Sequence, residues 1–176
     1  ADGYIPTTVD LNGTTYYTVE EGNFVARNTT TGQKYATLQD AVDAANAGDT
    51  IELLKNITLT GGYADDAEAG LGIKLPGNVG DADNEKGLTI DGKGFTIDCG
   101  NFTKGIRIYN YVSGRPSIVT FNNVTIQNEM HNGRCIDTRS GNINLKINNT
   151  DLIATKGNSQ PLTIGGTEKI HRVSLG

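Results

Sequence analysis

Hydrophobic and polar residues alternate in short runs along most of the chain after residue 49, a pattern that predicts half-buried β-strands. The runs form three tracks that recur in one order. The first track comprises residues 51–54, 88–90, 119–121, 143–147 and 173–175, the second comprises 57–59, 95–97, 124–126 and 152–154, and the third comprises 73–75, 106–108, 136–138 and 162–164. One round of three short strands cannot bury its own apolar side chains, so such rounds stack strand on strand. We therefore expect an all-β chain that forms a parallel β-helix of about four to five coils.

A corner recurs between the first two tracks, in which an apolar residue precedes a polar residue and then Asn or Gly. These two residue types enter the left-handed backbone region at low cost and suit sharp turns. The corner residues that we expect to stack, with hydrogen bonds between side-chain amides, are Asn56, Gly92, Asn123 and Asn149. Their steps of 36, 31 and 26 residues are typical of a solenoid.

The three tracks also predict which residues lie above one another in successive coils. The expected columns are Ile73/Ile106/Ile136/Leu162 and Leu75/Ile108/Thr138/Ile164 facing inward, Lys74/Arg107/Asp137/Thr163 facing outward, and a threonine ladder of Thr58, Thr96 and Thr125. The outward column places Arg107 against Asp137.

The first 36 residues predict β-hairpins that lead into a capping segment. An Asn12-Gly13 pair between β-prone runs is the strongest short hairpin signal, and a second hairpin is expected from 23–27 and 33–35. A helix over 37–47 follows, with Thr37 as its N-cap, and we expect it to cap the first coil. We thus divide the chain into a hairpin segment, 1–36, and a β-helix, 37–176. Its C-terminal end is expected to be open or truncated, continued by further coils or covered by a partner.

Composition and charge narrow the class of protein. With 23 glycines, no Trp and 6% aromatic residues, a thin stacked core is more natural than a thick globular one. The net charge of -5 and the scattered Lys and Arg argue against a nucleic-acid partner, and no apolar run is long enough to insert into a membrane. The chain starts at Ala1, so we expect a removed signal peptide or a piece of a longer protein. Cys99 and Cys135 are expected to be unconnected thiols, with pairing as the alternative.

One segment resembles a known family. Residues 35–42, YATLQDAV, followed by 47–53, AGDTIEL, are similar to the entry into right-handed β-helix domains of the pectin lyase-like superfamily. The resemblance covers about 33–176 and implies right-handed coils and an extracellular or cell-surface setting in a secreted bacterial protein. The superfamily includes enzymes, adhesins and passive stalks, so the resemblance leaves activity open.

Within that superfamily, enzymes that cut acidic polysaccharides use clustered carboxylates on an outward track, often with Arg or Lys as base. The nearest equivalents here are Arg107, Asp137 and Arg139, with His131 in the preceding loop. The alternative, which we favour, is that Arg107 and Asp137 form a surface ion pair that contributes at most about 1 kcal/mol.

Two further clusters could bind ligands. Asp81, Asp83 and Glu85 alternate in a Gly-rich loop and could hold calcium, although a solvated acidic loop is the favoured interpretation. The loop aromatics that could stack on sugars are Tyr63, Phe102, Tyr109 and Tyr111. They could equally cover the core from outside.

The sequence therefore favours a non-catalytic extracellular β-helix module that serves adhesion or carbohydrate binding through loops on a rigid scaffold. The alternative is a fragment of a polysaccharide lyase or glycoside hydrolase that acts on acidic plant or host polysaccharide. A pure spacer is a third interpretation.

Overall fold

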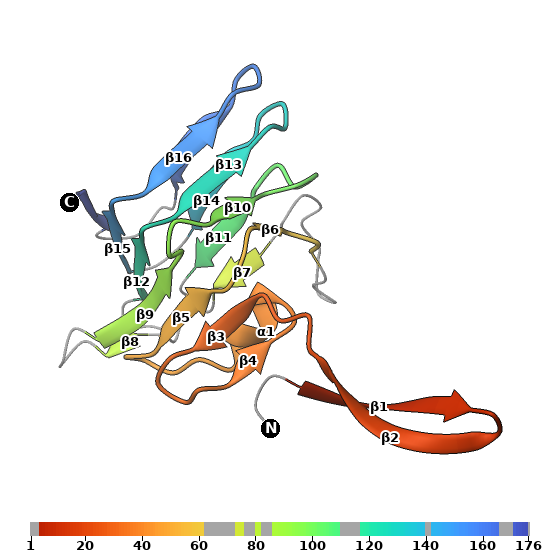
Figure 1. Ribbon diagram of the computed structural model, residues 1–176. Helices are drawn as coiled ribbons and strands as arrows, with labels where there is room; N and C mark the ends of the chain where they lie inside the picture. Colours follow the sequence, from red (N-terminus) through yellow and green to blue (C-terminus); the bar gives the residue numbers. More distant parts are fainter. Residues whose placement is uncertain are drawn as a thin grey trace.

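The structure is a computed structural model that describes residues 4–61, 73–75, 80–81, 86–109, 117–139, 142–165 and 171–175. The described part is all-β apart from one short helix (Figure 1). Most strands belong to three sheets, and all neighbouring strands from β5 onward pair in parallel except β8 (Gly80–Asp81), which is antiparallel to β9.

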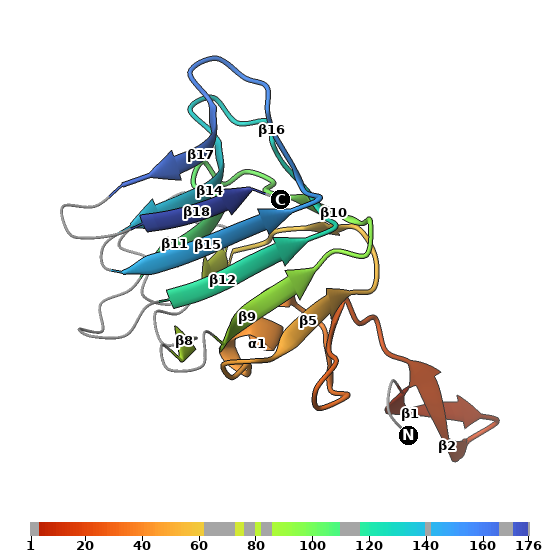
Figure 2. The same cartoon turned by 90° about the vertical axis from the view of Figure 1, so that its left-hand side faces the viewer.

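Successive strands visit the three sheets in the same order, as the tracks predicted. The first sheet contains β5 (Thr50–Leu53), β9 (Lys86–Asp91), β12 (Ser117–Asn122), β15 (Ile143–Asn148) and β18 (His171–Leu175). The second contains β6 (Ile57–Thr58), β10 (Thr96–Asp98), β13 (Thr125–Asn128) and β16 (Asp151–Ala154), and the third contains β7 (Ile73–Leu75), β11 (Ile106–Tyr109), β14 (Arg134–Arg139) and β17 (Gln160–Ile164). Each round of the chain thus adds one strand to each sheet (Figure 2).

The core consists of columns of similar apolar residues. On the third sheet, the register places Ile73, Ile106, Ile136 and Leu162 in one column and Leu75, Ile108, Thr138 and Ile164 in another, which confirms both predictions. On the first sheet, Ile90, Phe121 and Ile147 lie in register and are buried. Each strand therefore covers the apolar side chains of the round before it.

The predicted corner column is formed at its two later members. Asn149 Nδ2 donates to Asn123 Oδ1 at 2.8 Å, and both residues have positive φ angles, 43° and 50°. Side-chain amides at this corner thus bridge successive rounds while their backbones make the turn.

The two earlier members depart from the prediction. After Asp91 the chain makes an extra β-turn in which Lys93 and Gly94, with φ of 54° and 86°, take the left-handed positions that we expected of Gly92. Phe95 N donates to Gly92 O at 2.8 Å and closes this turn. At the first corner Asn56 Oδ1 accepts from Thr96 N at 2.9 Å, so Asn56 bonds the backbone of β10 rather than a stacked amide.

The predicted threonine ladder is correct only in part. Thr96 lies beside Thr125, but Thr58 lies beside Asp98, two positions further along β10. Glu52, Asp91 and Asn122 lie in register before the corner, and Ile57, Ile97 and Ile126 lie in register after it. The three corners therefore differ in length, and equal spacing from the corner residue does not give equal register.

The N-terminal segment forms the two predicted hairpins. Strands β1 (Tyr4–Leu11) and β2 (Thr14–Glu21) are joined by Asn12 and Gly13, both at positive φ, as in a type I′ turn. They form a separate two-stranded sheet that projects from the body (Figure 1). The second hairpin, β3 (Ala26–Asn28) and β4 (Lys34–Tyr35), continues the first sheet, because β3 pairs antiparallel with β5.

The helix, α1 (Leu38–Asp43), is shorter than the predicted 37–47. Thr37 is its N-cap, as expected, with Oγ1 accepting from Asp40 N at 3.0 Å. It ends early because Asn46 N donates to the Asp49 carboxylate instead of to a carbonyl one turn back. The described residues contain no helix with the length and hydropathy to cross a bilayer.

Candidate functional site

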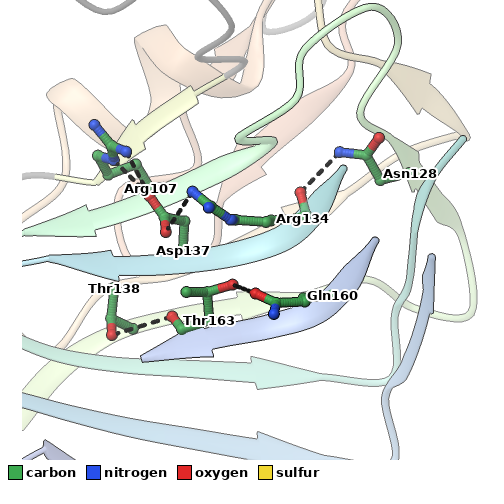
Figure 3. A network of polar contacts seen from close by, with 7 residues as sticks. All are labelled: Arg107, Asn128, Arg134, Asp137, Thr138, Gln160 and Thr163. Carbon is green, nitrogen blue, oxygen red and sulfur yellow. Dashed lines mark hydrogen bonds and ion pairs between the residues drawn. The ribbon is translucent and has the colours of Figure 1, made fainter. Parts of the chain in front are cut away.

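The clearest polar cluster lies on the third sheet and centres on Asp137 (Figure 3). Arg107 Nε on the neighbouring strand donates to Asp137 Oδ2 at 2.9 Å, and Arg107 Nη2 bonds the same oxygen. Arg134 Nη1, from the start of β14, lies 3.4 Å from Asp137 Oδ1. Both carboxylate oxygens are thus engaged by guanidinium groups.

This ion pair is buried, which corrects the expectation of a surface pair. Arg107 is 6% exposed and Asp137 is 4% exposed, although both alternate along their strands with core isoleucines. Neighbouring residues of a strand point to opposite faces, so both faces of the third sheet are shielded from solvent here. Alternation in the sequence predicts to which face of the sheet a side chain points, but not whether other residues shield that face from solvent. The sequence therefore does not predict that this pair is buried.

The other two residues of the catalytic alternative are exposed. Arg139 ends β14, two residues after Asp137, and His131 lies in the turn between β13 and β14. A Cβ added to Gly157 would lie 3.7 Å from Cδ2 and Nε2 of His131, so the imidazole lies beside the turn of the next round. The structure therefore buries two of the four candidate residues and leaves two at the surface.

Asn128, which the sequence analysis did not single out, organises the turn that leads to this cluster. Its side chain is fully buried, and its Nδ2 donates to the carbonyl of Phe102 at 2.9 Å. The same nitrogen donates to the carbonyl of Arg134 at 2.8 Å (Figure 3). Its Oδ1 accepts from Met130 N at 2.9 Å. One amide thus fixes the start of β14 and ties it to the loop of the previous round. In the sequence it is only another polar residue at a strand end.

Of the four aromatic candidates, Phe102 is the one whose side chain the structure describes. It is half-buried and packs against the core, and a Cβ added to Gly61 would lie 2.6 Å from Phe102 Cζ. The ring therefore lies against the Gly61 backbone, which supports a core-covering role. Tyr109 is the last residue of β11, and Tyr63 and Tyr111 lie outside the described residues.

The calcium candidates are mostly beyond what the structure describes. Asp81 is in β8, opposite Lys86 of β9, whereas Asp83 and Glu85 lie outside the described residues. Among the described residues, no three His, Cys, Asp or Glu side chains gather as a metal site would require.

The two cysteines are free, as the favoured interpretation predicted, and both are fully buried. Burial raises the pKa of the Cys135 thiol to about 11, and burial together with the nearby Cys135 also raises the pKa of Cys99. Cys135 Sγ donates to Ile153 O at 3.2 Å. Because the thiolate is the nucleophilic form, these residues suit packing rather than chemistry.

Comparison with known proteins gives one match. The sequence model of the family described as "Putative pectate lyase-like adhesive domain" matches residues 29–162, from the loop after β3 into β17. No curated protein and no solved structure matches the chain.

Proposed function

Because the chain belongs to the pectate lyase-like adhesive domain family, we propose that it is a non-catalytic adhesion module of an extracellular or cell-surface protein. The matched segment spans most of the three-sheet body and leaves out the β1–β2 hairpin. The family description supports adhesion, and the proposal extends it to a bacterial surface and to carbohydrate as the ligand.

The scaffold for this function is a right-handed parallel β-helix. Support comes from the strands, which return to the same three sheets in the same order in every round. Parallel connections within one sheet are overwhelmingly right-handed. Helix α1 would act as the N-terminal cap, with Leu38, Ala41 and Val42 buried against the first round. Such a rod holds its loops at fixed spacing, which suits multivalent attachment.

The observation that carries the non-catalytic proposal is the engagement of Asp137. General acid-base chemistry requires a carboxylate within reach of the substrate. Arg107 and Arg134 engage both oxygens of Asp137, and its side chain is buried. The alternative, a fragment of a polysaccharide lyase or glycoside hydrolase, would need this carboxylate to be released or other groups to act.

A glycan array probed with the labelled chain tests the proposal, together with product analysis of each bound glycan. We expect binding without shortened products. Silence across neutral and acidic glycans would refute carbohydrate as the ligand. Cleavage products that disappear with Asp137→Ala, under conditions in which circular dichroism shows that this variant is still folded, would establish the enzyme alternative.

A further inference from the structure

The N-terminal segment covers the lower edges of two of the three sheets. Strand β3 pairs with β5 at the edge of the first sheet, and α1 lies against β7 at the edge of the third. The terminal strand of the second sheet, β6, pairs with β10 on one side, and no described strand pairs with it on the other (Figure 1).

A groove lies along this open edge of β6. Its volume is about 290 Å³. It is lined by residues 55–61 on β6 and the segments next to it, by residues 36–39 at the start of α1, and by Asn23 and Val25. Ile57 and Leu59 give the groove an apolar component, while Thr58 and Thr60 are exposed. It therefore has the mixed lining that an extended polypeptide segment needs.

The backbone of β6 directs unpaired groups toward the groove. Leu59 N donates to Asp98 O at 2.8 Å, so the amide of Leu59 points toward β10. Alternate residues of a strand direct their N–H and C=O groups to opposite sides, so those of Thr58, the last residue of β6, point away from β10. An exposed strand edge of this kind is a template for another strand.

The β1–β2 hairpin is a second element whose strands have unpaired edges, because its sheet contains only two strands. It projects from the body as a two-stranded sheet, and Val9, Leu11 and Tyr16 on one of its faces are 41%, 57% and 53% exposed (Figure 2). An isolated hairpin of two strands is at best marginally stable in water. A third strand would complete it.

Opposite charges favour binding of the β1–β2 hairpin to the open edge of β6. Residues 4–21 include Asp10, Glu20 and Glu21 and no Lys or Arg. A hollow of about 560 Å³ adjoins the groove, shares Asn23 and Lys55 with it, and is also lined by Arg27 and Lys34. Because Arg27 is paired with Glu52, the excess positive charge of the hollow comes from Lys34 and Lys55. The only strand pair without a neighbour in the described structure is thus acidic, and the surface beside the open edge carries excess positive charge.

We propose that one strand of the β1–β2 hairpin in one copy pairs with the open edge of β6 in a second copy. The second copy does the same in return, and the two copies form a two-fold symmetric dimer. The hairpin of the same chain projects away from the body (Figure 1). The three-residue linker that follows β2 is held at its far end, where Val25 N donates to Tyr35 O at 2.9 Å. A symmetric exchange satisfies both edges at once and closes without forming a fibre.

Sedimentation equilibrium of the whole chain tests the proposal. We expect a monomer-dimer equilibrium that shifts toward monomer at high salt. Thr58→Pro should abolish the dimer, because it removes an N–H that faces the groove and leaves the bond from Leu59 to Asp98 intact. Leu11→Ser with Tyr16→Ser should do the same, whereas Thr8→Ser, on the opposite face of the hairpin, is the matched control and should leave the dimer unchanged.

A cross-linking experiment separates exchange between copies from docking within one chain. Thr58→Cys and Tyr16→Cys are made in separate chains, mixed and oxidised. A disulfide-linked heterodimer is expected, with Thr18→Cys near the hairpin base linking less. Thr58→Lys provides a second edge variant if Thr58→Pro does not fold. A chain that stays monomeric at millimolar concentration, or a dimer that survives both edge variants, would overturn the proposal, as would cross-linking only within a chain that carries both cysteines.

Discussion

Asn149 Nδ2 donates to Asn123 Oδ1 at 2.8 Å across two successive rounds, and one residue earlier Asn148 Nδ2 donates to Asn122 Oδ1 at 2.9 Å. The chain therefore carries two amide rungs side by side at one corner. Asn123 also turns the backbone, at a φ of 50°. A single residue type thus supplies both the turn and the link between rounds.

The two roles of Asn123 can be separated by substitution. Asn123→Ala should lower the free energy of unfolding by about 2–3 kcal/mol, because it adds left-handed strain and removes hydrogen bonds. Asn123→Gly relieves the strain and should lower it by only about 1 kcal/mol. Urea unfolding measures both, and equal losses would show that φ contributes nothing.

The buried pair of Arg107 and Asp137 predicts a larger effect. Asp137→Ala leaves the Arg107 guanidinium buried without its partner, so we expect a loss of about 3–5 kcal/mol in the free energy of unfolding. The double variant Arg107→Met with Asp137→Leu should regain most of that loss, since it removes both charges. Glu52→Ala is the control: its partner Arg27 is 41% exposed, and the expected loss is at most about 1 kcal/mol. A loss at Asp137 as small as that at Glu52 would contradict the burial.

Gly133 is required for the turn that Asn128 organises. A Cβ at Gly133 would lie 2.4 Å from Asn128 Oδ1 and 2.6 Å from the Met130 carbonyl. Gly133→Ala should therefore lower stability by about 1–3 kcal/mol, the usual cost of overpacking. Gly157→Ala, whose Cβ would meet nothing closer than 3.7 Å, should change stability by less than about 0.5 kcal/mol. Thermal melts compare the two, and equal shifts would show that the turn adjusts.

The sequence predicts the register of the third sheet well, because each of its strands has an apolar residue at the first of two inward positions and all but β14, which has Thr138, have one at the second. Ile106 and Ile136 could be placed in one column without any structural information. The second corner could not be placed from the sequence in this way, since the extra turn at Lys93 and Gly94 fits the same apolar-polar-Gly pattern as a shorter corner. Corner length decides the register, and the pattern does not specify it.

The candidate site was less predictable than the sheets. Alternation correctly placed Arg107 beside Asp137, but their burial depends on what lies over the outward face. The role of Asn128 was not predicted for a related reason. Its side chain bonds the carbonyls of Phe102 and Arg134, which only the folded loops bring together. Local patterns predict pairs within a sheet better than contacts between loops.

The buried cysteines predict chemical inertness. Iodoacetamide at neutral pH should leave Cys99 and Cys135 unmodified in the folded chain, because both are buried and burial raises both pKa values. In urea both should react, and the mass of the intact chain should rise by two adducts. Failure of both to react after unfolding without reductant would indicate a disulfide and contradict the free thiols.

Asp49 predicts a specific loss of stability in acid. Burial raises its pKa, but hydrogen bonds from Asn46 N, the Asn28 amide and Thr30 outweigh that effect, so the native pKa lies below the ordinary value. The unfolded chain then binds more protons, and the stabilising contribution of Asp49 is complete above the unfolded pKa of about 3.9. It is lost as the pH falls through the lower native value. Asp49→Asn should therefore flatten the dependence of the free energy of unfolding on pH below about 4, relative to the parent chain. Urea unfolding across that range measures the slopes, and identical slopes for Asp49→Asn and the parent chain would refute the role of Asp49.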